Sequence, residues 1–136
     1  MKNGLWIIAL TILIASCKEM TEDDKASTLL SQIESLYEKG EFSTTLDSIE
    51  GLRSKFPRAV QSRKRALVLW QNASLKMAQI DIAHTDSALQ STMNQMESED
   101  NIYKRNMLGV KCDSLRARYE AMCGVVRMIH LRQKDQ

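Results

Sequence analysis

Few residues in this chain could do acid–base or metal chemistry, and they form no recognisable motif. The sequence has two histidines, and His84 has Asp81 three residues before it, about one helical turn away. Such a pair could serve as a base or metal ligand, but a single His beside Asp on a polar helix face is typical of a solvated surface. His130 lies among arginines near the C-terminus, where we also expect solvation. We predict neither a metal site nor a cofactor.

Motifs that carry catalysis elsewhere are missing as well. The sequence contains no Gly-x-Ser-x-Gly or His-Glu-x-x-His, and no glycine pattern of a phosphate or dinucleotide loop. A hydrolase would also need a rigid concave surface, of which a thin helical rod offers little. We therefore predict that the protein is not an enzyme.

Cys112 and Cys123 are eleven residues apart. Along one helix this spacing is ~16 Å, whereas a disulfide requires Cα atoms within ~7 Å. If the segment is helical, the two thiols cannot pair with each other. We expect both to be packed as small hydrophobic side chains. An interchain bridge in an oxidising envelope is the alternative.

Two blocks of basic residues stand out, although the net charge of the chain is only +2. The first block contains Arg53, Lys55, Arg58, Arg63, Lys64 and Arg65; the second contains Arg116, Arg118, Arg127, Arg132 and Lys134. We expect solvated helix faces, with an anionic glycan or lipid, such as lipopolysaccharide phosphates, as the alternative ligand of the first block. The low overall charge argues against nucleic-acid binding.

The N-terminus has the order of an export signal. Lys2 precedes the uncharged apolar stretch 4–14, and Ile14-Ala15-Ser16-Cys17 closes it. The stretch is shorter than the ~20 residues that span a bilayer, which favours a targeting segment. Residues 14–17 resemble the lipobox of bacterial lipoproteins. This resemblance implies that residues 1–16 are a cleaved signal peptide and that Cys17 receives a lipid anchor.

Residues 18–25 are polar and acidic, so we expect a flexible tether over 17–25. In the Gram-negative sorting rule, an aspartate directly after the lipidated cysteine retains the protein in the inner membrane. This position is Lys18 here, which favours the outer membrane. A basic residue followed by acidic ones also resembles the surface-export signals of Bacteroides-type lipoproteins, with a plain linker as the alternative. Which face of the membrane carries the protein stays open.

Three Asp-Ser-apolar triplets resemble the O-glycosylation sequon of exported Bacteroides proteins. They place Ser48, Ser87 and Ser114 as candidate acceptors, and use of these sites would require solvent-facing hydroxyls. Such triplets also arise by chance on amphipathic helices.

The remaining sequence predicts helices throughout. Apolar residues at three- and four-residue spacings predict helices over 26–39 and 43–56, which would form an antiparallel hairpin, 26–57. Gly40 should end the first helix, and the spacing of Thr44 and Asp47 fits a capping box that starts the second. Residues 28–60 resemble a single tetratricopeptide-type hairpin on the following positions: Tyr37, Gly40, Phe42, Leu52, Phe56 and Pro57. Because Thr45 replaces the usual alanine and no second copy follows, we do not expect a solenoid.

No proline or glycine interrupts residues 58–99, which predicts one long helix. Its expected apolar stripe contains Ala66, Trp70, Ala73, Met77 and Ile80, then Ile82, Leu89, Met93 and Met96. An acidic break at 97–101 should turn the chain into a helical segment, 102–136. There the heptad positions are Leu108, Cys112, Leu115, Tyr119, Met122, Val126 and Ile129. A short strand over 125–129 is the alternative to helix.

These features predict an all-α fold: a helical hairpin, a long helix and a returning C-terminal helix, packed like a coiled coil. The chain resembles small helical lipoproteins of Bacteroides-type bacteria, which implies the cell envelope but no known activity. We expect an adaptor or scaffold that is anchored by lipid and binds a protein partner, or a second copy, through its helical stripes. The alternative is a module that binds an anionic glycan or lipid with the basic block.

Overall fold

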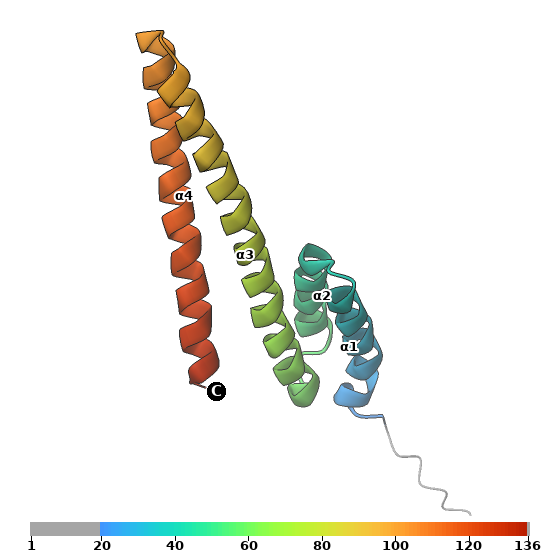
Figure 1. The fold of residues 1–136 in the computed structure, drawn as a ribbon. Coiled ribbons are helices and arrows are strands. Elements are labelled where there is room, and N and C mark those ends of the chain that lie inside the picture. The colour runs from blue at the N-terminus through green and yellow to red at the C-terminus, as the bar shows by residue number, and fades with distance from the viewer. Residues whose placement is uncertain (1–19, 136) are drawn as a thin grey trace, which may run out of the picture.

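The computed structural model describes residues 20–135, and all but short connections are helical. The elements are α1 (Glu22–Glu38), α2 (Phe42–Lys55), α3 (Val60–Ser98) and α4 (Ile102–Lys134) (Figure 1). No strand occurs within residues 20–135, so the all-α prediction is confirmed and the alternative strand over 125–129 is wrong. No helix in this part of the chain combines the length and apolar character needed to cross a bilayer.

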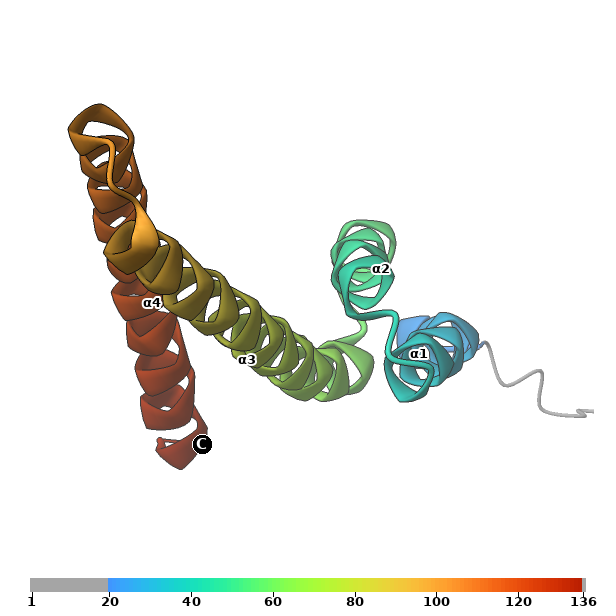
Figure 2. The same ribbon diagram turned by 45° about the horizontal axis from the view of Figure 1, so that its top comes forward.

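The four helices form two parts that share α3. Helices α1 and α2 pack on each other and on the first half of α3, while α4 runs back along α3 from the far end. Both views place α4 on the side of α3 away from α1 and α2 (Figures 1 and 2). Among residues 20–135, the second half of α3 therefore has only α4 as its neighbour.

Helix α1 begins four residues earlier than its apolar spacing predicts. The hydroxyl of Thr21 accepts a hydrogen bond from the backbone N–H of Asp24 at 3.1 Å. The carboxylate of Asp24 accepts in return from the backbone N–H of Thr21 at 2.9 Å. This capping box satisfies two backbone donors and starts the helix at Glu22. Residues 22–25, which we expected in the tether, are thus part of α1.

The turn between α1 and α2 follows the predicted glycine. Gly40 has a φ of 78°, a left-handed conformation that a residue without a Cβ adopts at little cost. Its N–H donates to Tyr37 O at 3.0 Å, and the N–H of Glu41 donates to Leu36 O at 3.0 Å, which is a Schellman motif. The predicted capping box at Thr44 is wrong, because α2 already begins at Phe42.

The best-packed core lies where α1, α2 and α3 meet. Ile33, Ile49 and Leu52 are completely buried, and Leu30 and Ala66 complete the cluster. Thr45, which stands where the tetratricopeptide pattern has alanine, is also fully buried. Its hydroxyl donates to Glu41 O at 2.8 Å, so the polar group is satisfied inside its own helix.

The contact between α3 and α4 is a longer and less deeply buried seam. All seven predicted heptad positions of α4 are buried or half-buried, which confirms the periodicity of the returning helix. On α3 a row of alternating three- and four-residue steps is buried or half-buried: Gln71, Leu75, Ala78, Ile82, Thr85, Leu89, Thr92 and Met96. The stripe predicted for the first half of α3 is partly wrong. Ala66 and Ala73 are buried, but Trp70, Met77 and Ile80 remain 38–47% exposed because the core needs only the small side chains there.

Candidate functional site

A largely apolar hollow forms a groove along α3, between α4 and Leu46 of α2. Its volume is about 560 Å³. Helix α2 contributes only Leu46, whereas α3 and α4 provide the floor and the second wall. These contributions are Ser74, Met77, Ala78, Ile80, Asp81 and His84 from α3, and Arg118, Met122 and Val125 from α4. The groove exists because α2 and α4 flank α3 without touching each other.

An ion pair joins α3 to α4 at this groove. Arg118 donates from Nη2 to Asp81 Oδ1 at 2.6 Å and from Nε to Asp81 Oδ2 at 3.2 Å. The hydrogen bonds and charge of Asp81 raise the pKa of Arg118 above its ordinary value. Both carboxylate oxygens of Asp81 thus accept hydrogen bonds from Arg118, while His84 is exposed and lines the groove. The Asp81–His84 spacing therefore produces no acid–base pair.

A second set of exposed apolar side chains is on α4, and the surface that they form is called here the outer face of α4. Tyr103, Met107, Val110, Met128 and Leu131 are each at least half exposed. Their spacing places them on one side of the helix, roughly opposite the seam. Large apolar residues that recur in this way on a surface are characteristic of interaction sites, whereas isolated ones are not.

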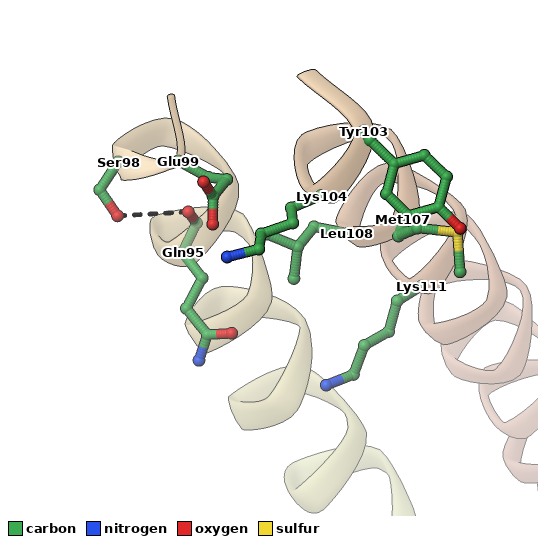
Figure 3. A pocket seen from close by; sticks show the side chains of 8 residues that line it. All are labelled: Gln95, Ser98, Glu99, Tyr103, Lys104, Met107, Leu108 and Lys111. Atoms are coloured by element: carbon green, nitrogen blue, oxygen red, sulfur yellow. Dashed lines mark hydrogen bonds between the residues drawn. The ribbon is translucent and has the colours of Figure 1, made fainter. Parts of the chain in front are cut away.

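A second hollow, of about 650 Å³, lies at the end of the α3–α4 hairpin (Figure 3). Gln95, Ser98 and Glu99 line one side, and five residues of α4 line the other: Tyr103, Lys104, Met107, Leu108 and Lys111. Figure 3 shows both lysine side chains reaching from α4 toward the end of α3. These groups can bind a polar or anionic segment but form no reactive pair.

The first basic block is gathered where α2 ends and α3 begins. Arg53, Arg63 and Lys64 line a shallow hollow of about 240 Å³ together with Val60 and Leu67. Lys55 and Arg58 are exposed beside it in the chain. Arg65 differs, because it forms an ion pair with Glu34 at 2.5 Å. We call the five other basic residues the basic corner.

The two thiols are both on α4 and unpaired, as the helical spacing requires. Cys112 is buried in the seam and Cys123 is half-buried. Cys123 lies close enough to Tyr119 to raise the pKa of the phenol, by charge and by a hydrogen bond. This contact lies within the α4 surface and involves no further nucleophile.

The remaining predicted sites are the three candidate glycan acceptors and the lipidation site, Cys17. Ser87 and Ser114 are exposed, as glycan acceptors must be, whereas Ser48 is half-buried. Cys17 lies outside the described residues. Within residues 20–135, no group of three or more His, Cys, Asp or Glu side chains could hold a metal ion.

Comparison of the chain with known families and proteins gives a uniform result. No family model, curated protein or solved structure matches it.

Sequence reasoning missed the groove and the Asp81–Arg118 pair. A turn centred near residue 100 would place residue 81 opposite residue 119 in an antiparallel hairpin, so the opposite charges were a usable signal. The position of Leu46 was not predictable in this way, because it depends on how the α1–α2 hairpin docks on α3.

Proposed function

We propose that this protein is a non-enzymatic adaptor of the bacterial cell envelope, anchored by lipid at Cys17, that binds a protein partner through its α3–α4 hairpin. The groove along α3 is the observation that carries this proposal. It presents exposed Met77 and Ile80, together with Val125, beside a charged pair that can orient a ligand. Apolar lining with a few placed polar groups is the usual composition of a binding site.

An amphipathic helix is the occupant that best fits the groove. Helix α3 forms its floor and α4 one wall, while Leu46 closes it on the side of α2, so a further helix can lie against α3 and α4 with an apolar face toward α3. Met77 and Met122 can adapt their shape to different side chains. The outer face of α4 offers a second contact area for the same partner or for another copy of the chain.

The polar chemistry of the described residues supports binding over catalysis. Asp81 is paired with Arg118, and Cys112 is buried in the seam. His84 and His130 are exposed on different helices, and neither has a hydrogen-bond partner that would orient it as a base. Anchoring follows from the resemblance of residues 14–17 to a lipobox, because several acyl chains on one cysteine give stable membrane attachment.

The groove can be tested by site-specific photo-crosslinking in the producing cells. A photoreactive residue at Ile80 should give an adduct of defined mass, and one at Gln90, which is exposed on α3 but does not line the groove, should not. Met77→Glu placed together with the Ile80 probe should lower the adduct yield roughly tenfold, since binding would bury an unpaired charge. A covalent dimer of the chain would identify a second copy as the occupant. Equal labelling from Ile80 and Gln90 would reject the groove as a binding site.

A further inference from the structure

The start of α1 lies close in sequence to the proposed anchor. The capping box at Thr21 leaves only three residues between it and Cys17. Four Cα-to-Cα steps span at most ~14 Å when fully extended. If Cys17 carries the lipid, as the proposed function states, the N-terminal end of α1 must therefore stay within that distance of the membrane surface.

Hydrogen bonds fasten this end of α1 to the basic corner. The Glu22 carboxylate accepts from the backbone N–H of Arg58 at 3.2 Å. Asp23 Oδ1 accepts from the backbone N–H of Ser62 at 2.8 Å, and the hydroxyl of Ser62 donates to Asp23 O at 3.4 Å. The start of α1, the α2–α3 connection and the start of α3 thus form one end of the molecule (Figure 1).

At this end of the molecule, the acidic side chains bind backbone groups within the protein, whereas the basic side chains are exposed. Glu22 and Asp23 are half-buried; Glu22 accepts from a backbone N–H of the α2–α3 connection, and Asp23 accepts from one in the first turn of α3, where the helix dipole is positive. The basic corner is exposed, and none of its five side chains has a carboxylate within ion-pair distance among residues 20–135. Arg63 donates to Pro57 O at 2.6 Å, and the Lys55 ammonium lies 5.6 Å from the centre of the Phe56 ring.

We propose that the basic corner binds the phosphates of anionic lipids at the membrane that carries the anchor, so that the α3–α4 hairpin projects away from the bilayer. Arginine and lysine bind phosphate oxygens through charge-assisted hydrogen bonds. The hollow between Arg53, Arg63 and Lys64 lets three cations approach one headgroup region. The 39 residues of α3 then carry the far end of the hairpin ~58 Å from the corner. The contact would fix the orientation of the helices relative to the bilayer.

Energy transfer from the protein to the membrane can measure this orientation. The protein purified from the membranes of the producing cells, with Cys112 and Cys123 replaced by alanine, is reconstituted into vesicles containing headgroup-labelled acceptor lipid. A fluorophore is attached through Ser98→Cys at the far end of α3, or through Ser54→Cys beside the corner. One set of vesicles is phosphatidylcholine alone, and the other contains equal parts of phosphatidylcholine and phosphatidylglycerol.

On phosphatidylglycerol vesicles we expect strong transfer from position 54 and weak transfer from position 98. Transfer from position 98 should rise severalfold on vesicles of phosphatidylcholine alone. The same rise is expected for the charge reversal Arg58→Glu with Arg63→Glu and Lys64→Glu, because the α3–α4 hairpin can then tilt about the anchor. Reversal of three basic residues near the far end, namely Lys104, Arg105 and Lys111, is the matched control and should leave transfer unchanged. All six side chains are exposed, so circular dichroism should show unaltered helix content.

Two failures are distinguishable. If the protein floats with both kinds of vesicle but transfer from position 98 is the same for wild type and corner variant, the lipid contact is wrong and the anchor stands. If the wild-type protein does not float with phosphatidylcholine vesicles, the anchor is wrong and the oriented contact falls with it.

Discussion

The two parts that share α3 are built differently. In the N-terminal part, Ile33, Ile49 and Leu52 are fully buried against neighbours from three helices. In the α3–α4 hairpin, the seam is filled largely by half-buried side chains, and large apolar residues remain exposed beside it. The difference indicates that the first part supplies most of the stability of the fold, while the hairpin leaves apolar surface exposed, as the proposed adaptor role requires.

The largest effect should come from truncation in the N-terminal core. Ile49→Ala should lower the free energy of unfolding by about 3 kcal/mol, because a fully buried side chain leaves a cavity. Leu115→Ala, at a half-buried position of the seam, should cost only about 1 kcal/mol. Urea denaturation monitored by circular dichroism measures both. Equal losses would contradict the division into a stabilising part and a binding part.

A smaller loss is expected when the connection between α1 and α3 is weakened. The backbone N–H of Ser62 is the main cause that holds the pKa of Asp23 below its ordinary value of 3.8. The folded-state pKa is depressed, so this contribution is present above about pH 4 and disappears as the pH falls through the lower folded value. Asp23→Asn should lower the melting temperature at pH 7 and flatten its decrease below pH 4. Thermal melts of both proteins between pH 7 and pH 2 measure this difference. Parallel plots of melting temperature against pH for the two proteins would rule out a contribution from Asp23.

The smallest effect should be a gain in the hairpin. A Cβ at Gly124 would have no atom other than its own helix within 4 Å. Gly124→Ala should therefore stabilise α4 by about 0.5–1 kcal/mol through helix propensity alone. Gly40→Ala is the contrasting variant, because its left-handed φ makes any side chain unfavourable there. Differential scanning calorimetry should give shifts of opposite sign, and a destabilised Gly124→Ala would mean that α4 is constrained at this position.

Local signals predicted most of the fold. The 4-3 spacing from Leu108 to Ile129 identified the face of α4 that packs on α3, and Gly40 marked the end of α1. Helix starts were less predictable, since α1 depends on the Thr21 capping box in a stretch without apolar periodicity. Periodicity alone also placed Trp70 in the core, whereas the structure buries Ala66 and Ala73 and leaves Trp70 exposed.

The candidate sites were harder to predict because they depend on distant segments. The groove requires α2 and α4 to flank α3, a tertiary arrangement that no local spacing encodes. The basic corner was visible as a block of charge, but its relation to the proposed anchor depends on where α1 begins. Arg65 belongs to the same run in the sequence and is nevertheless separated from the corner by its pairing with Glu34.

Both proposals place the protein at a bilayer through Cys17, and intact-mass analysis of the protein extracted from the producing cells tests this directly. We predict a chain that begins at Cys17 and carries the mass of a diacylglycerol with or without an additional acyl chain; Cys17→Ala should abolish this modification. A chain that retains residues 1–16 and has no lipid on the cysteine would contradict the account.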